Sequence, residues 1–208
     1  MVTSPIAAKR EDRRDAILDV AQQCFVAEGY GATSMSTIAA RLGGSKATLY
    51  HYFKSKEELF DAFVRRFCAR FQRQLEAIPE QGDVRERLVQ MATDLLTQLL
   101  SPEGIAIHRL VVGEGERFPE LARLFYQAGP QTGTARVAEI IKNLMDRGVL
   151  RRADPVLTAY QFSGLALAGI FNLRLWGVID DPSPAKIREL AANAVDTFLR
   201  AHAPEPEA

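Results

Sequence analysis

The stretch GGSKATLYHYFKSKEEL, residues Gly43 to Leu59, decides how the first part of this chain folds. Two glycines interrupt a helical pattern, and no acidic residue follows them until Glu57. The basic, aromatic and hydroxyl side chains that crowd the next positions are Lys46, Thr48, Tyr50, His51, Tyr52, Lys54 and Lys56. The whole chain has 26 Lys and Arg against 26 Asp and Glu, so this bias is local.

A tight turn is expected at Leu42–Ser45, between short helices over about 35–42 and 46–52. Two short helices joined by a glycine turn form a helix-turn-helix. With about 100° between successive residues, Leu49 and Phe53 share the inward side of the second helix. Ala47 then points outward, flanked by polar and aromatic groups. The pattern predicts a helix that presents a polar face while its other side is buried.

The outward face has the chemistry of a helix that lies in the major groove of DNA. Lys46 can reach a base or a phosphate, Thr48 a base edge, and the small Ala47 a thymine methyl. The remaining side chains are expected at phosphates or helix ends. The candidate DNA-binding residues are Thr33, Ser45, Lys46, Ala47, Thr48, Tyr50, His51 and Lys56. Thr33 is expected to cap the first helix of the pair. The alternative is an ordinary solvated helix surface.

Charge is distributed unevenly along the chain. Residues 1–56 contain 8 basic and 5 acidic residues, which leaves 18 basic and 21 acidic residues for the remainder. A basic N-terminal piece on a more acidic body favours a polyanionic partner for the first piece. So small an excess is also compatible with chance.

The rest of the chain is expected to be helical, because apolar residues recur at helical spacing and no period-two strand is evident. Capping signatures at Ser55–Glu58 and Asp83–Glu86 mark two helix starts. Helices are expected over about 10–28, 56–78, 83–100, 102–114, 119–128, 133–147, 155–176 and 183–200. The prediction is an all-α protein of about ten helices. Its domains are a helix-turn-helix domain at 1–55, a ligand-binding and dimerisation domain at 56–201, and a disordered tail at 202–208.

Residues 29–60, GYGATSMSTIAARLGGSKATLYHYFKSKEELF, resemble the DNA-binding domain of the TetR family of bacterial transcriptional regulators. The likeness rests on Gly29-Tyr30, Ile38-Ala39, Ser45-Lys46, Thr48-Leu49-Tyr50 and Lys56–Leu59. Gly44 departs from the pattern, because a branched apolar residue usually packs there. Thr37 stands where an acidic residue is common. The stretch RLVVGEGERFPELARLFYQAGP is similar to regulators grouped with AefR.

The resemblance implies a homodimer made by the last two helices. The segment PVLTAYQFSGLALAGIFNLRLW, residues 155–176, supports this independently, because it is apolar on nearly every side. A helix without a polar face is buried on two sides. Gly164 and Ala168 would allow close packing of a partner helix. The alternative is a central core helix of a monomer.

The resemblance also implies a ligand pocket in the body. We take as candidates the polar or bulky groups that interrupt apolar helices. They are Phe67, Phe71, Met91, Leu95, His108, Tyr126, Gln161, Asn172 and Trp176. For each residue taken singly, packing in the core is the simpler interpretation.

No enzyme signature is found: the sequence has no phosphate-binding glycine loop and no clustered Cys/His metal spacing. We therefore expect a regulator that needs no cofactor and no metal, most simply a repressor released from a palindromic operator by a small apolar or amphipathic effector. Two alternatives stay open, a DNA-bound structural or division-linked factor without ligand control and a helical carrier of a lipophilic molecule.

Cys24 and Cys68 form no disulfide framework, and together with the absence of a signal-peptide pattern they favour a cytoplasmic location. A redox role for Cys68 is a minor alternative.

Overall fold

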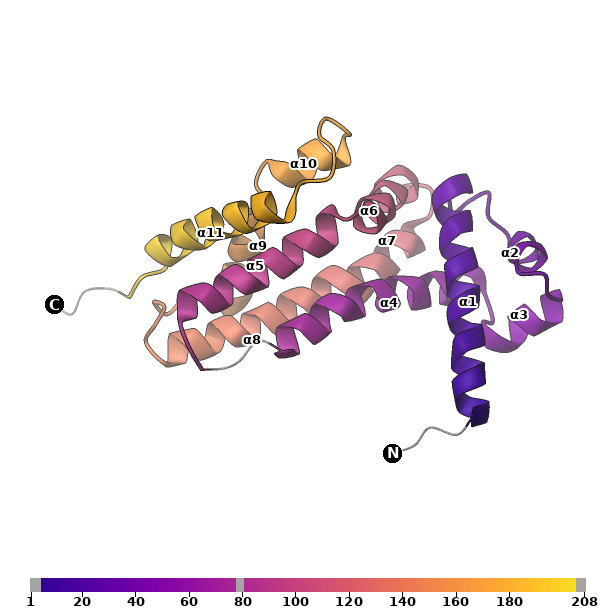
Figure 1. Ribbon diagram of the computed structural model, residues 1–208, viewed down its shortest axis with the longest axis horizontal. Coiled ribbons are helices and arrows are strands. Elements are labelled where there is room, and N and C mark those ends of the chain that lie inside the picture. Colours follow the sequence, from indigo (N-terminus) through magenta and orange to yellow (C-terminus); the bar gives the residue numbers. More distant parts are fainter. Residues whose placement is uncertain (1–4, 78–80, 205–208) are drawn as a thin grey trace. The chain divides into compact units, whose positions relative to one another are not determined.

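A computed structural model describes residues 5–77 and 81–204 of the chain. Every regular element within these residues is helical, as expected for an all-α protein (Figure 1). No helix among them combines the length and the apolarity that crossing a bilayer requires. The described residues form two compact units, and α4 (Lys56–Ala77) contributes to both.

The first unit contains the helix-turn-helix. It comprises the described residues up to Phe67 together with Ala106–Ala128. Its elements are α1 (Pro5–Glu28), α2 (Met35–Arg41), α3 (Lys46–Tyr52), the start of α4, most of α6 (Pro102–Glu114) and α7 (Pro119–Tyr126). Phe25, Tyr30 and Phe60 are buried together, with ring centroids 5.6 to 5.7 Å apart. These edge-on and tilted ring contacts join α1 and α4 around the loop that leads into α2.

The second unit is a helical bundle made of Cys68–Ile105 and the described residues from Gly129 onward. It contains the end of α4 and the helices that follow from α5 onward, apart from α6 and α7. These are α5 (Val84–Leu100), α8 (Thr132–Asp146), α9 (Pro155–Leu167), α10 (Ile170–Leu175) and α11 (Pro184–Ala201). A π-helical segment, η1 (Gln127–Gln131), contains Pro130 and leads directly into α8. In this bundle α11 packs against α5 and α9, and α8 packs against α9 (Figure 1).

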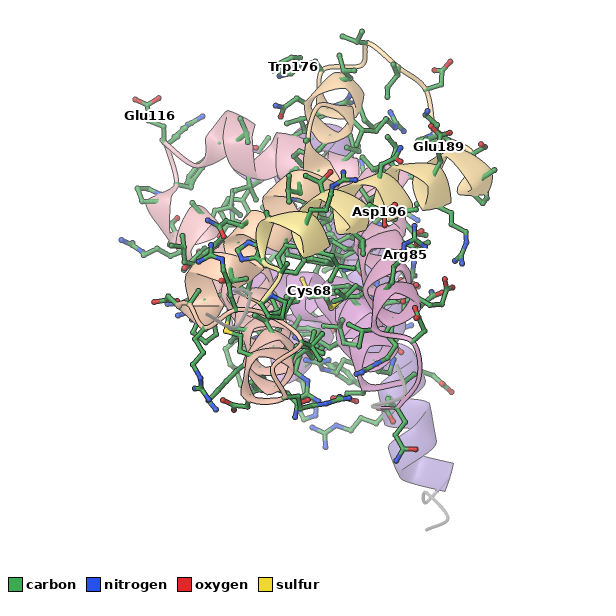
Figure 2. All side chains as sticks on the ribbon, turned by 90° about the vertical axis from the view of Figure 1, so that its left-hand side faces the viewer. Cys68, Arg85, Glu116, Trp176, Glu189 and Asp196 are labelled. Carbon is green, nitrogen blue, oxygen red and sulfur yellow. The ribbon has the colours of Figure 1, made fainter. Side chains whose placement is uncertain are left out.

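Apolar side chains at helical spacing fill the core of the second unit. Phe162 of α9 meets Phe198 of α11 edge-on, with ring centroids 5.2 Å apart, and both side chains are buried. A bidentate ion pair ties the exposed sides of α5 and α11, because Arg85 Nε and a second guanidinium nitrogen lie 2.6 and 2.9 Å from the Asp196 carboxylate (Figure 2). Such exposed pairs contribute little to stability, so the buried apolar side chains that α5, α9 and α11 share hold this part of the bundle together.

Four details differ from the sequence-based expectations. Helix α1 begins at Pro5 instead of near residue 10. The expected helix over 155–176 is broken, because Gly169 adopts a left-handed conformation with φ of 76° between α9 and α10. The compact units group α6 and α7 with the N-terminal helices, unlike a division at residue 55, and the boundary between functional domains stays a prediction. His202 is not part of a free tail: it is buried against Phe198. The end of the expected tail, residues 205–208, lies outside the described residues.

Candidate DNA-binding surface and ligand cavity

Helix α3 is fixed at both ends by short-range contacts. Ser45 caps its start, and the Ser45 hydroxyl accepts a hydrogen bond from the Thr48 backbone N–H at 3.0 Å. The capping satisfies one of the unpaired N–H groups of the first turn. Leu49 and Phe53 are completely buried, which confirms the predicted inward side. The Arg14 guanidinium lies 4.9 Å from the centre of the Phe53 ring and covers it.

The opposite side of α3 is open. The residues exposed there or at its cap are Ser45, Lys46, Ala47, Thr48, Tyr50 and His51. The Lys46 ammonium lies 5.8 Å from the centre of the Tyr50 ring, so a cation and an aromatic hydroxyl occupy the same side. This side has donors, acceptors and a small central alanine, which is the chemistry that a base-reading helix requires. That these residues contact DNA stays a prediction.

The turn before α3 is tight despite its two glycines. Gly43 adopts a left-handed conformation with φ of 67°, which a side chain would strain. Its neighbour Gly44 donates a backbone hydrogen bond to the carbonyl of Ala39 at 3.2 Å. A Cβ atom at Gly44 would lie 3.2 Å from a guanidinium nitrogen of Arg13. The arginine of α1 therefore occupies the space beside Gly44.

The prediction that Thr33 caps α2 is wrong. Ser34, not Thr33, caps α2, and the Ser34 hydroxyl accepts from the backbone N–H of Thr37. Thr33 is only 1% exposed, and its hydroxyl donates to the Gly29 carbonyl at 2.7 Å. A buried hydroxyl committed to the preceding loop is not available to a phosphate. Sequence reasoning placed the cap one residue too early because Thr and Ser are both good N-caps.

Lys56 lies against Tyr30 at the start of α4. Its ammonium donates to the Tyr30 carbonyl at 2.8 Å and lies 4.2 Å from the centre of the Tyr30 ring. The Tyr30 hydroxyl in turn donates to the Glu57 carboxylate at 3.2 Å. Burial raises the pKa of Tyr30, and the nearby Glu57 carboxylate raises it further, so the phenol stays a hydrogen-bond donor. Lys56 therefore holds the loop before α2. The sequence predicted only a contact of Lys56 with a phosphate and not this structural role.

Glu114 at the end of α6 is a positioning residue that sequence reasoning missed. Its carboxylate accepts hydrogen bonds from two successive backbone N–H groups, those of Tyr30 and Gly31, the second at 2.8 Å. Phe118 lies edge-on to Tyr30, 5.4 Å between centroids. A Cβ atom at Gly31 would lie 2.9 Å from the Phe118 ring, so this close approach requires glycine. The α6–α7 segment is thereby bonded to the loop that leads into α2.

A cavity of about 100 Å³ lies within the second unit, between the end of α4, the start of α5 and α8. Its apolar lining comes from Leu75, Val84, Leu88, Met91, Ile140 and Leu144. Its polar lining comes from Arg87, Arg136 and Glu76. The Arg87 Nε atom is buried and has no hydrogen-bond partner among the described residues. Apolar walls with a few polar groups are the usual lining of a small-molecule site, but such sites commonly measure about 300–1,000 Å³, so this one suits only a compact ligand.

The predicted ligand residues are divided between the two units. Met91 lines the cavity, whereas Phe71 and Leu95 pack in or against the core of the second unit. Phe67, His108 and Tyr126 belong to the first unit. The remaining three, Gln161, Asn172 and Trp176, lie exposed on α9 and at α10, and their role in ligand binding stays a prediction. Both arginines of the cavity were missed.

A signal for Arg87 was present in the sequence. Val84, Arg87, Leu88 and Met91 follow the spacing of a buried helical stripe, so Arg87 interrupts that stripe. The same holds for Arg136, which lies one turn before Ile140 on α8. An arginine on an apolar stripe is a stronger pointer to a polar cavity than the aromatic residues that we selected.

An apolar surface remains exposed along α9, α10 and the segment after α10. Its members, with exposed fractions of 38 to 69%, are Val156, Leu157, Tyr160, Leu173, Trp176 and Val178. Trp176 stands at the outer edge of the second unit (Figure 2). Gly164 is exposed too, and a Cβ atom there would meet nothing within 4 Å. A surface of this kind is typical of a protein–protein interface.

An all-α chain with a capped, outward-facing second helix after a glycine turn is a helix-turn-helix DNA-binding protein in its fold. Comparison with known families makes the class specific. Residues 17–63 match the model of bacterial regulatory proteins of the tetR family, and residues 86–204 match the C-terminal domain of AefR-like transcriptional repressors. The chain belongs to the TetR family of bacterial transcriptional regulators, and it is not an enzyme.

Individual relatives agree with this assignment over most of their length. The flavonoid-responsive regulator FrrA is 33% identical, with a TM-score of 0.80 over 94% of this chain and 100% of that chain. A protein from Mesorhizobium loti MAFF303099, described as a TetR-family transcriptional regulator, is 28% identical, with a TM-score of 0.80 over 93% of this chain and 98% of that chain. The HTH-type transcriptional regulator YhgD of Bacillus subtilis is 26% identical over 77% of this chain and 84% of its own length.

Proposed function

We propose that the protein is a ligand-responsive repressor that binds a palindromic operator as a homodimer and is released by a small effector. The observation that carries the proposal is the exposed side of α3, where Ala47 stands opposite the buried Leu49 and is flanked by the exposed Lys46 and Thr48. The inner side fixes the helix to its own unit, so the outer side is free to enter a major groove. Within this proposal the protein acts in the cytoplasm, on double-stranded DNA.

The roles of the exposed groups follow from their lengths and chemistry. Thr48, in the first turn of α3, is proposed to donate or accept at a base edge, and Lys46 to reach a base or a phosphate. Ala47 allows the backbone to approach and can contact a thymine methyl. Tyr50 and His51 are proposed at phosphates, because contacts to phosphates fix the register of the helix without reading sequence.

A dimer supplies the second reading helix. The exposed apolar side chains of α9 and α10, such as Tyr160 and Trp176, support an interface there, together with the open space at Gly164. A two-fold dimer reads two half-sites one helical turn apart, about 34–36 Å on B-DNA. The proposed operator is therefore palindromic.

Control by a ligand is supported by the cavity of the second unit and by the relatives. The matched C-terminal family model is that of a repressor, and FrrA is described as flavonoid-responsive. Helix α4 contributes Lys56 to the loop before α2 and Leu75 to the cavity lining, so one continuous helix takes part in both features. A ligand shifts DNA binding only by its differential affinity for the two states, commonly about 1–3 kcal/mol.

Selection of bound sites from a random duplex library, with the purified dimer, tests the proposal. Enrichment of one palindrome is the expected result, and purification of a monomer or enrichment of no sequence would overturn it. The selected duplex then serves to test ligand control. If no effector ever changes operator affinity, the chain acts as a DNA-bound structural factor, the second function compatible with the α3 surface.

A further inference from the structure

The cavity between α4, α5 and α8 combines an apolar floor with a permanent positive charge. Leu88 and Met91 of α5 are buried at 2% and 1% exposure, and both line it. Arg87, one residue before Leu88 and one turn before Met91, also lines the cavity and is half-buried. A guanidinium keeps its charge at every physiological pH. The cavity lining therefore combines the positive charge of Arg87 with the apolar side chains of Leu88 and Met91.

The hydrogen bonding of Arg87 is incomplete. Its Nε atom is buried without a partner among the described residues, although buried donors are ordinarily paired. The Nε–H and a neighbouring terminal N–H form the fork that matches both oxygens of a carboxylate. The Nε atom itself is inaccessible to a water-sized molecule, so an anion in the cavity would pair with it only after the Arg87 side chain turns. An apolar ligand alone would leave the donor unsatisfied in either conformation.

A second arginine lies in the same lining. Arg136 of α8 donates to Glu139 on its own helix at 2.6 Å, and both side chains are about half exposed. An exposed pair of this kind is worth little, so it competes weakly with a ligand. Glu76 is the acidic member of the lining, and it is exposed. The balance of charge in the lining is positive by one.

The size of the cavity limits the body of the ligand. Its volume is about 100 Å³, and an apolar cavity of about 150 Å³ is known to hold benzene. The space is smaller than that but partly open to solvent, so a single ring or a short branched chain enters it with one edge exposed, whereas most of a long acyl chain would stay in water. Shape and charge together define a narrow chemical class.

We infer that this cavity binds a compact monocarboxylate, with its ring or short chain against Leu88, Met91 and Ile140 and its carboxylate on the Arg87 guanidinium. The inference depends on the proposed function at one point only, namely that the bound monocarboxylate is the effector of the repressor. Binding itself involves no DNA and is testable on the protein alone.

Calorimetric titration of the full chain with benzoate tests the inference, with benzamide as its neutral analogue and hexadecanoate as a long-chain acid. We expect saturable benzoate binding with a Kd of about 1 mM or tighter. Benzamide should bind roughly tenfold or more weakly, because it cannot form the charge-assisted pair. Equal affinity for benzoate and benzamide, tighter binding of hexadecanoate, or no saturable benzoate binding would overturn the inference.

Substitutions assign the binding to the cavity. Arg87→Met keeps an unbranched side chain and removes the charge, so benzoate affinity should fall roughly tenfold or more. Arg87→Lys keeps the charge without the fork and should give an intermediate loss. Arg73→Met, on the exposed side of α4, is the matched control and should bind as the wild type does. Circular dichroism establishes that each variant is folded, and wild-type affinity in a folded Arg87→Met overturns the assignment.

Operator binding separates this inference from the proposed function. If benzoate binds through Arg87 but leaves operator affinity unchanged, the cavity assignment stands and ligand control fails. If the operator is bound and released by a neutral or larger ligand while benzoate does not bind, ligand control stands and the monocarboxylate assignment fails.

Discussion

The bond between Glu114 and the loop before α2 is expected to stabilise the entrance to the helix-turn-helix. Glu114→Gln is the sharpest perturbation, because it preserves the size of the side chain. The carboxylate accepts from both the Tyr30 and the Gly31 backbone N–H groups. A glutamine has one acceptor oxygen, and its amide NH₂ cannot accept from the second N–H. One backbone donor is therefore left to solvent or unpaired.

The magnitude follows from the number and type of the bonds. A hydrogen bond to a charged group contributes about 1.5–3 kcal/mol. Glu114 is half-buried, so water replaces part of the lost bond, and the lower end of that range applies. A loss of about 1.5–2 kcal/mol corresponds to roughly 10- to 30-fold faster opening-limited amide exchange at these positions.

Hydrogen–deuterium exchange on peptides that cover residues 29–34 measures this increase in exchange rate directly. Glu116→Gln, two residues further on and exposed, is the matched control and should leave those peptides unchanged (Figure 2). Peptides from α11 serve as an internal reference in both variants. Unchanged exchange at residues 29–34 in Glu114→Gln would refute the claim that the carboxylate holds this loop.

Three further predictions concern the second unit. Ala168→Glu places a charge on the exposed apolar surface, and light scattering should report a monomer where the wild type is a dimer, with unchanged helicity. Phe198→Ala should cost about 3–5 kcal/mol of unfolding free energy in urea titration, because it empties a fully buried ring site, whereas the half-buried Leu199→Ala should cost clearly less. Burial lowers the pKa of His202 from its usual 6.5, and Arg151 lowers it further, so its contribution to stability is present above about pH 6.5 and is lost as the pH falls through the lower folded-state value. The drop in melting temperature from about pH 7 to pH 5 should accordingly be larger in the wild type than in His202→Leu.

Local capping chemistry made most helix starts predictable from the sequence. Asp83 caps α5 as its pattern indicated, and Asp154 and Ser183 cap α9 and α11 near their expected starts. At Ser55 the signature was half right: the hydroxyl accepts from the Glu58 N–H at 3.2 Å, but the Glu58 carboxylate accepts from Lys54 and not from Ser55. Caps involve residues three apart, so a sequence contains all the required information.

Features that depend on distant residues were not predictable in the same way. The break at Gly169 lies in an apolar run that is compatible with a continuous helix, and a glycine alone does not decide between the two. Glu114 and Tyr30 are 84 positions apart, and no local pattern pairs a carboxylate with two particular backbone amides. The outward side of α3 was predictable because it depends only on helical spacing around the buried Leu49.

The central claim is that the exposed side of α3 reads base sequence, and Thr48 tests it most directly. Equilibrium binding of the wild type and of Thr48→Ala should be measured on the selected operator and on duplexes with single base-pair changes in each half-site. The account predicts that Thr48→Ala relaxes the preference at one position of each half-site by about 1–3 kcal/mol and leaves the salt dependence unchanged. Identical base preferences in the two proteins, or a loss that is uniform over all duplexes, would contradict it.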